Sequence, residues 1–260
     1  MKKVIFCLLI STLMGCGTSN NKDKKWVFIL AGQSNMSGRG VVESQDTITN
    51  KSINTLNKDL QLELAREPLH FYEPDLAGVG PGFAFGKELK KSVPSNVEII
   101  LVPCAIGGSS IDQWLGDSLH RGVHLYSNFK TRLDTITKIG TVKAILWLQG
   151  ESDANSNGLS SYKTKLEDLF QRFRRDVENS SLPILVGEIG TYSEPESKNQ
   201  NWKSLNNIIN DVAKEDKNTY IISSEGLTSN PDHVHYNSES QRTLGKRFAN
   251  KYLNVVYQKQ

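Results

Sequence analysis

The chain has 260 residues, among them 31 Lys and Arg, 28 Asp and Glu, five His and three Cys. This near balance of charge argues against a nucleic-acid-binding footprint, and no cluster of Cys and His has the spacing of a metal site. The length is ample for one domain with its own hydrophobic core.

The N-terminus has the pattern of a secretory signal. Lys2 and Lys3 precede a largely apolar stretch, residues 4–14, which is too short to span a bilayer as a stable anchor. Leu13-Met14-Gly15-Cys16 then resembles a bacterial lipobox. We therefore expect an exported bacterial lipoprotein, anchored on the periplasmic or cell-surface side of a membrane, with a signal peptide at 1–15, a lipidated Cys16 and a polar tether at 16–25. A plain signal peptide with an incidental cysteine is the alternative.

Removal of residues 1–15 would take away Cys7, and lipidation would use Cys16. Only Cys104 would then keep a free thiol, so we expect no intramolecular disulfide despite export. The remaining chain would hold 29 basic and 28 acidic residues.

Five short apolar runs alternate with helical patterns along the rest of the chain. Because the runs are continuously apolar, we expect strands buried on both faces of a parallel sheet. The predicted strands cover residues 26–31, 97–102, 142–148, 183–189 and 220–223. The predicted helices cover residues 83–92, 126–138, 162–178, 202–214 and 239–253, the last after a capping box at Ser238 and Gln241. This order predicts βαβ units, a three-layer αβα sandwich and one domain at 26–260.

Polar motifs fall where the predicted strands end. Segments 39–80, 105–125 and 149–158 are expected to be long loops at that edge. Ligands bind outside the carboxyl ends of the strands in open α/β sheets. We therefore expect a site there, built from Ser34, Gly107, Gly108, Gln149, Glu151, Asp232 and His235.

Ser34, Asp232 and His235 have the chemistry of a serine acyl-transfer site. Their spacing lets the Asp232 carboxylate reach the near nitrogen of the His235 ring and leaves the other nitrogen facing Ser34. Each residue also has an ordinary interpretation: Ser34 as a helix cap, Asp232 as a turn residue and His235 as a solvated loop residue. His233 is a rival base, but it neighbours Asp232 in sequence and meets it less easily.

The segments after the second and third strands offer hydrogen-bond donors to an oxyanion. The N–H groups of Gly107 and Gly108 can approach a reacting carbonyl closely, and the Gln149 amide can donate to the same oxygen. The alternatives are a plain turn or a phosphate cradle for the glycines, and glycosidase acids for Glu151 and Asp153. A serine hydrolase would use all four polar segments and a glycosidase only one, which favours the hydrolase.

Four motifs in order resemble the SGNH-type carbohydrate acetylesterases. The nearest branch is the sialate-O-acetylesterase-like domain grouped with carbohydrate esterase family six, which includes acetylxylan esterases. The resemblance covers the chain after Lys25 and implies a flavodoxin-like αβα sandwich with a five-stranded parallel sheet. The motifs are Gly32-Gln33-Ser34-Asn35-Met36, residues 107–114, Gln149-Gly150-Glu151-Ser152-Asp153 and Asp232-His233-Val234-His235, and residues 78–86 are similar as well.

The resemblance also implies roles for the site residues. Ser34 would be the nucleophile, His235 the general base and acid, and Asp232 the group that orients His235. Glu151 is a possible supporting acid and the alternative to Asp232 in the triad.

The oxyanion hole implied by the resemblance consists of the Ser34 N–H, the Gly107 N–H and the Gln149 side chain. Gly108 is the alternative backbone donor. No metal or organic cofactor is expected.

The implied reaction is hydrolysis of an acetyl ester on a sugar hydroxyl. Acetylated xylan or a related plant polysaccharide is the first substrate choice, because the chain lacks the β-rich insertion of larger sialate O-acetylesterases. O-acetylated sialic acid is the second choice, and a surface lipoprotein that binds glycans without turnover is the alternative of another class. The candidates for the sugar side of the site are Arg39, Tyr72, Trp114 and Tyr192.

Overall fold

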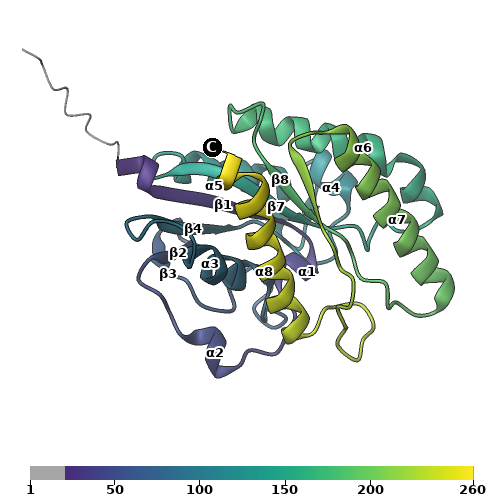
Figure 1. The fold of residues 1–260 in the computed structure, drawn as a ribbon. Coiled ribbons are helices and arrows are strands. Elements are labelled where there is room, and N and C mark those ends of the chain that lie inside the picture. Colours follow the sequence, from purple (N-terminus) through teal and green to yellow (C-terminus); the bar gives the residue numbers. More distant parts are fainter. Residues whose placement is uncertain (1–20, 260) are drawn as a thin grey trace, which may run out of the picture.

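The computed structural model describes residues 21–259 and shows a seven-stranded sheet covered by helices on both faces (Figure 1). The strand order is β3-β2-β4-β1-β7-β8-β9, and all pairings are parallel except that of β2 with β3. The five predicted strands are β1, β4, β7, β8 and β9, arranged as in flavodoxin-like sheets. The predicted α/β fold is therefore confirmed. The strands of this sheet are β1 Lys25–Gly32, β2 Ile53–Leu56, β3 Leu62–Leu64, β4 Glu98–Pro103, β7 Thr141–Leu148, β8 Ile184–Gly187 and β9 Thr219–Ile222.

The strand count of five is wrong, because β2 and β3 extend the sheet beyond β4. Both lie in segment 39–80, which we expected to be a loop. Each is only three or four residues long, and β3 lies at the sheet edge with two of its three residues exposed. Such short strands carry no apolar run that sequence periodicity could reveal. A separate hairpin, β5 Leu119–His120 and β6 Val123–His124, was missed for the same reason.

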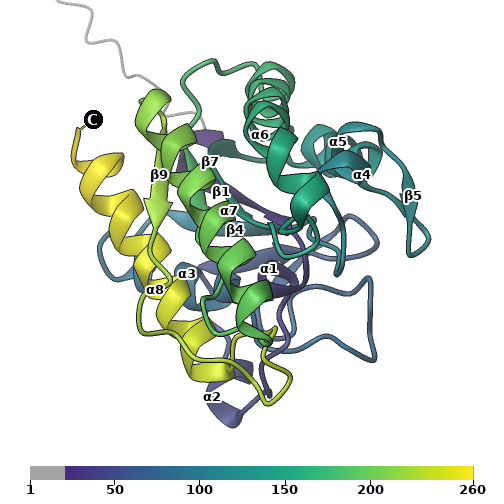
Figure 2. The same cartoon turned by 90° about the vertical axis from the view of Figure 1, so that its right-hand side faces the viewer.

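The helices form two layers, one on each face of the sheet (Figures 1 and 2). In β1, Phe28 and Leu30 belong to the core under α3 and α8, whereas Val27 and Ile29 belong to the core under α4 to α7. All four side chains are fully buried, as expected for a strand covered on both faces. The helices are α1 Ser34–Ser37, α2 Ser44–Thr47, α3 Pro81–Lys90, α4 Ile111–Leu115, α5 Leu125–Ile136, α6 Ser156–Asp176, α7 Glu196–Glu215 and α8 Ser238–Val255, with 3-10 turns η1 Asn21–Lys24 and η2 Tyr257–Lys259.

Helix α8 begins at Ser238, and the predicted capping box is wrong. Asn237 is the N-cap residue, and its side chain accepts a hydrogen bond from the Ser240 N–H at 2.9 Å. Ser238 and Gln241 instead make tertiary contacts: the Ser238 hydroxyl donates to the Val41 carbonyl at 2.8 Å, and the Gln241 amide donates to the Asn35 carbonyl at 3.0 Å. The start of α8 is thereby tied to the segment that follows β1.

The predicted signal peptide and lipidation site, Cys16, lie outside the described residues. The predicted tether is too long at its C-terminal end, because Asn21–Lys24 forms η1 and Lys25 is already the first residue of β1. The Lys22 ammonium also donates to the Thr137 carbonyl at 3.0 Å. Residues 21–25 are therefore part of the domain. Among residues 21–259, no helix has both the length and the apolar character needed to cross a membrane.

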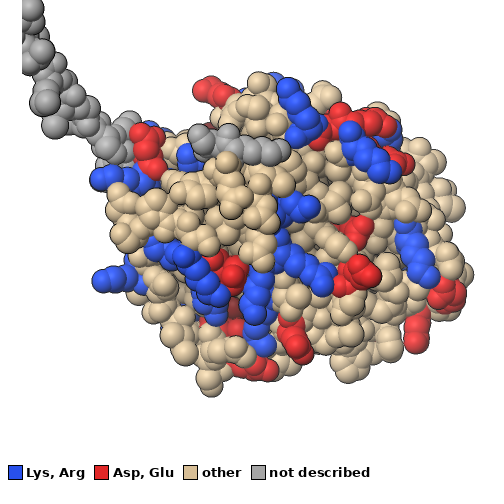
Figure 3. Space-filling view, in the orientation of Figure 1, with Lys and Arg blue, Asp and Glu red and all other residues tan. Residues whose placement is uncertain are grey.

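The charged side chains are mixed on the face that carries α3 and α8. Figure 3 shows Lys and Arg side chains lying among Asp and Glu side chains rather than forming one continuous patch. Several are paired there, including Arg242 with Asp46 at 2.6 Å and Lys91 with Glu88 at 2.6 Å. This pattern matches the near-neutral composition and gives that face no field of a single sign.

Glu67 is a buried carboxyl group that fixes the chain between β3 and α3. Its side chain is only 3% exposed and accepts hydrogen bonds from the N–H groups of Leu69 at 3.0 Å and Gly80 at 3.3 Å. Burial raises the pKa of Glu67 to about 8, and these hydrogen bonds oppose the rise only in part. A pKa of about 8 favours the protonated form of Glu67 in the folded protein at neutral pH.

This pKa predicts that stability falls as the pH rises. Between the unfolded pKa of about 4.3 and the folded pKa of about 8, only the folded state keeps the Glu67 proton. The stabilisation is complete below this window and is lost as the pH rises through it, by up to about 1.4 kcal/mol per pH unit. We expect urea unfolding to show that the free energy of unfolding of the wild type falls between pH 5 and pH 7.5, relative to that of the Glu67→Gln variant. Parallel curves for the two proteins would contradict this prediction.

Candidate active site

Ser34 lies on a sharp turn at the carboxyl end of the central strand. Gly32 ends β1 with φ of 135°, and a Cβ there would lie 2.0 Å from the Leu148 carbonyl oxygen of β7, so only glycine fits. After Gln33, the chain enters the one-turn helix α1 with Ser34 as its first residue. The hydroxyl is thereby presented at the edge of the sheet, although Ser34 is only 5% exposed.

The structure brings Ser34, His235 and Asp232 together across 201 residues of chain. The Ser34 Oγ lies 3.0 Å from Nε2 of His235, and Nδ1 of the same ring lies 2.7 Å from Oδ2 of Asp232. The other Asp232 oxygen, Oδ1, accepts from the backbone N–H groups of Val234 and His235, both at 2.9 Å. A hydroxyl, an imidazole and a carboxylate in this order can generate a serine nucleophile.

The two candidate acids lie in different surroundings. Partial burial alone would raise the pKa of Asp232, but hydrogen bonds from His235 and Val234 outweigh it and hold the pKa below its usual range. Burial raises the pKa of Glu151, against a hydrogen bond from Asn35. Glu151 makes no hydrogen bond to His235 within residues 21–259; its Oε1 accepts from Asn35 Nδ2 at 2.5 Å. The geometry thus gives Asp232 the contact with the imidazole and leaves Glu151 linked to the site through Asn35.

The predicted oxyanion donor Gly107 already has an acceptor. Its N–H donates at 2.6 Å to Oε2 of Glu73, a carboxylate that also contacts Arg39 at 2.7 Å and Arg121. A Cβ at position 107 would lie 2.3 Å from the Arg39 guanidinium, so only glycine lets Arg39 and Glu73 lie this close to the backbone at position 107. The N–H of Gly108, the alternative donor, has no acceptor among the described residues. The Gly108 N–H, unlike that of Gly107, is therefore free to donate a hydrogen bond to a ligand.

Gln149 does not present its amide to the site. Its side chain is fully buried, and Nε2 donates to Asp153 at 2.5 Å, to the Ser109 carbonyl at 3.1 Å and to the Gln33 side chain at 3.2 Å. Its Oε1 accepts from the Tyr162 hydroxyl at 2.8 Å. The structure therefore places Gln149 beneath the site, where it joins the loops after β1, β4 and β7, and not among the open donors.

A hollow of about 300 Å³ opens over Ser34 and His235. Of the four residues predicted for the sugar side, only Arg39 lines it; Trp114 is fully buried in the core, and the Tyr72 hydroxyl donates to the Pro103 carbonyl at 3.0 Å. Sequence reasoning missed several lining residues because they come from segments with no motif. These are Leu76, Arg121, Lys198 and Trp202.

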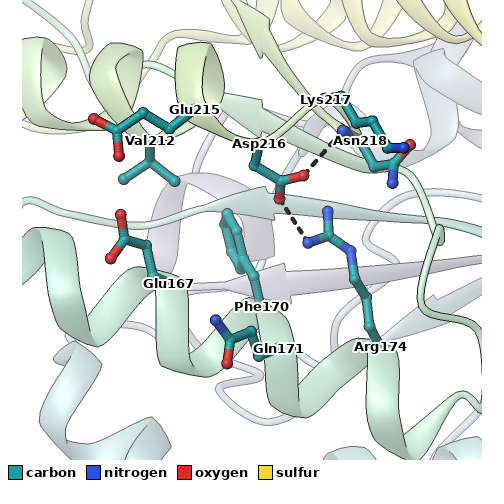
Figure 4. Close-up of a pocket in the computed structure, with 9 residues that line it drawn as sticks. All are labelled: Glu167, Phe170, Gln171, Arg174, Val212, Glu215, Asp216, Lys217 and Asn218. Carbon is teal, nitrogen blue, oxygen red and sulfur yellow. Dashed lines mark hydrogen bonds and ion pairs between the residues drawn. The ribbon is translucent and has the colours of Figure 1, made fainter.

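A larger hollow of about 530 Å³ lies between α6 and α7, away from this chemistry (Figure 4). Asn218, which lines it, directly precedes β9 and so marks the amino end of the parallel strands, opposite Ser34. Its charged groups are largely paired, with Arg174 2.6 Å from Asp216 and Glu215 2.6 Å from Lys163. No titratable pair there resembles a nucleophile and its base. Within residues 21–259, no group of three or more His, Cys, Asp or Glu could hold a metal ion.

The chain has an α/β fold with a mostly parallel central sheet, a fold that it shares with solved hydrolase structures. A sequence model of the family described as carbohydrate esterase, sialic acid-specific acetylesterase matches residues 24–254. The chain belongs to this family of carbohydrate esterases. The prediction of a carboxylic ester hydrolase is therefore confirmed, against the alternative of a glycan-binding module without turnover. Membership of carbohydrate esterase family six and of its acetylxylan esterase branch stays a prediction.

Relatives with known names agree with this assignment. A protein of Arabidopsis thaliana named as a probable carbohydrate esterase is 34% identical over 250 residues, which cover 88% of this chain and 90% of that protein. Its crystal structure superposes with a TM-score of 0.77 at 32% identity and covers 88% of this chain and 98% of that one. A carbohydrate acetylesterase from Xanthomonas citri shares the fold, with a TM-score of 0.64 at 19% identity over 90% of this chain and 57% of that chain.

The geometry predicts which acid supports His235. We expect Asp232→Asn to lower kcat for p-nitrophenyl acetate by about 10³- to 10⁴-fold, because the imidazole loses the carboxylate that fixes its tautomer. Glu151→Gln keeps the acceptor for Asn35 and should cost less than about tenfold. Ser34→Ala serves as the inactive reference, and circular dichroism confirms folding of all three variants. A larger loss for Glu151→Gln than for Asp232→Asn would transfer the role of triad acid to Glu151.

Proposed function

We propose that the protein removes O-acetyl groups from a carbohydrate through Ser34. The observation that carries the proposal is the hydrogen-bonded chain from Ser34 through His235 to Asp232, at the edge where ligands bind in this fold. Family membership supports the carbohydrate ester as the substrate class.

In the proposed reaction the Ser34 oxygen attacks the acetyl carbonyl carbon while its proton passes to Nε2 of His235. The tetrahedral intermediate collapses, the bond to the sugar oxygen breaks, and the sugar leaves with the proton from His235. Water then attacks the acetyl-enzyme with His235 again as base, which releases acetate and restores Ser34. Asp232 stays ionised throughout and stabilises the imidazolium.

Backbone amides are the proposed stabilisers of the intermediate's oxyanion. The Ser34 N–H and the Gly108 N–H need no rearrangement to donate to this oxygen, since neither has an acceptor among the described residues. The Gly107 N–H would become available only after Glu73 has moved away from it. We therefore place Ser34 and Gly108 ahead of Gly107 as donors, and we assign no such role to Gln149.

The charge around Ser34 favours an acidic sugar over a neutral one. Arg39 and Arg121 share the single carboxylate of Glu73, so one positive charge is left over, and the Arg121 side chain is 44% exposed. Lys198 adds a second cation to the lining, 5.3 Å from the centre of the Trp202 ring. A sugar carboxylate is complementary to these cations. We propose an O-acetylated sialic acid as the substrate, in place of the acetylated xylan that the sequence favoured.

Loss of the cations should weaken binding of an acidic substrate only. We expect Arg121→Ala and Lys198→Ala each to raise KM for O-acetylated sialic acid about tenfold, because a charge-assisted hydrogen bond contributes about 1.5–3 kcal/mol. Activity on uncharged p-nitrophenyl acetate should change little. Lys203→Ala, which removes an exposed lysine paired with Glu196, is the matched control. Faster acetate release from acetylated xylan, unaffected by either variant, would restore the polysaccharide as the substrate.

We propose that the domain reaches its substrate as an exported lipoprotein held by acylation of Cys16. The support is the order of a charged start, an apolar stretch and Gly15-Cys16 in the sequence. In a bacterial host, the full chain should incorporate labelled palmitate and fractionate with membranes. Cys16→Ala should lose both properties, and incorporation that persists in this variant would disprove the assignment.

A further inference from the structure

Asn35, the residue after the proposed nucleophile, has every hydrogen-bonding group of its side chain engaged. Its Oδ1 accepts from the Tyr236 N–H at 3.0 Å, and its Nδ2 donates to the Val234 carbonyl at 3.2 Å and to Glu151 Oε1 at 2.5 Å. The residue is fully buried. An amide offers two donors and an acceptor, so these contacts fix its orientation completely.

The partners of Asn35 stand on both sides of the proposed base. Val234 and Tyr236 are the residues directly before and after His235, and Asn35 bonds the carbonyl of the first and the N–H of the second. Asn35 is itself adjacent to Ser34 in the first turn of α1. One side chain therefore connects the backbone that carries the hydroxyl to the backbone that carries the imidazole.

The turn that carries Asn35 has two further anchors, one to α8 and one to β7. The Asn35 carbonyl accepts from Gln241 Nε2 of α8 at 3.0 Å, and the Gln33 N–H donates to the Leu148 carbonyl of β7 at 2.9 Å. The His235 loop follows β9, which lies three strands from β1 in the sheet, so strand pairing does not hold it beside Ser34. The hydrogen bonds from the Asn35 side chain to Val234 and Tyr236 thus hold the His235 loop against the turn that follows β1.

Glu151 is the third hydrogen-bond partner of the Asn35 side chain. Its Oε1 accepts from Asn35, whereas its Oε2 is buried with no hydrogen-bond partner among residues 21–259. A carboxyl group with one oxygen in contact only with Asn35 is placed to orient the amide rather than to contact His235. This explains why Glu151 lies so close to the site without a hydrogen bond to the imidazole.

We infer that Asn35 is a positioning residue that sets the distance between Ser34 Oγ and His235 Nε2. Glu151 fixes the orientation of the Asn35 side-chain amide. This inference rests on the proposed function. Within residues 21–259, the Asn35 side chain makes no hydrogen bond to the imidazole or the hydroxyl, so it acts through the backbone of Val234 and Tyr236. A misplacement of reacting groups by about 1 Å can cost about 100-fold in rate.

The test compares Asn35→Ala and Asn35→Asp with the wild type on p-nitrophenyl acetate. Both variants lose the bond to the Val234 carbonyl, and Asn35→Asp also places a carboxylate against Glu151. We expect kcat to fall about 100-fold with KM within about twofold, since the substrate contacts are unchanged. The double variant Asn35→Asp with Glu151→Gln reverses donor and acceptor across the same pair, and it should recover about tenfold of the lost kcat.

Asn206→Ala is the matched control for loss of a buried, backbone-bridging amide. Asn206 lies in α7, is 6% exposed and bonds both the N–H and the carbonyl of Ile189 at 2.9 Å, and within residues 21–259 it makes no hydrogen bond to Ser34, His235 or Asp232. It should lower the melting temperature about as much as Asn35→Ala does while kcat stays within about twofold. Equal losses of kcat in the two variants would show that Asn35 acts on stability alone and would overturn the inference.

Labelling of Ser34 by a fluorophosphonate separates this inference from the proposed function. The Ser34 oxygen displaces fluoride from phosphorus and its proton passes to His235, so the rate reports the serine–imidazole pair without any acetyl ester. If the wild type hydrolyses no acetyl ester but is labelled, and Asn35→Asp is labelled about 100-fold more slowly, the proposed function fails and the inference stands. Equal labelling of wild type and variant, or no labelling of the wild type, would overturn it.

Discussion

The parallel pairing of β1 with β4 and β7 is the constraint on which the site depends. In register, Leu30 lies beside Pro103 and Gly32 beside Leu148, so the three strands end together and their following segments meet at one edge. Ser34, the Gly107-Gly108 turn and the Gln149-to-Glu151 segment are brought together by this register alone. His235 is different, because β9 lies three strands away from β1. Its loop must return across the edge, and specific hydrogen bonds rather than strand pairing fix its path.

The sequence was sufficient where a residue's surroundings repeat along the chain. The central strands are buried on both faces, so their continuous apolar runs revealed them, and the order of strands and helices gave the layers. β2 and β3 carry no such run, because these short strands are fixed by their pairing partners rather than by their own composition. The capping-box prediction was wrong for a related reason. Ser238 and Gln241 fit the local pattern, but both side chains donate hydrogen bonds to backbone carbonyls of segment 35–41 instead.

The candidate site divides in the same way. The meeting of Ser34, Asp232 and His235 could be anticipated, since Asp232 and His235 are close in sequence and Ser34 follows a strand. Glu73 could not, because it lies in a segment with no motif and reaches Gly107 only through the folded path of residues 39–80. Gln149 has the right chemistry for an oxyanion donor, yet Asp153 and Ser109 occupy its amide. Residue type shows what a side chain can do, and its tertiary partners decide whether it remains free to do so.

Neutral amides connect several of the loops around the nucleophile. Gln33 accepts from Gln149 and from the N–H groups of Gly150 and Ser152, while Asn35 joins the His235 loop from the other side. An amide can donate and accept at once, so it satisfies buried backbone groups on two segments without the desolvation cost of an ion. Among residues 21–259, Asp232 is the one carboxylate hydrogen-bonded to His235, which is the electrostatic arrangement that a serine esterase requires.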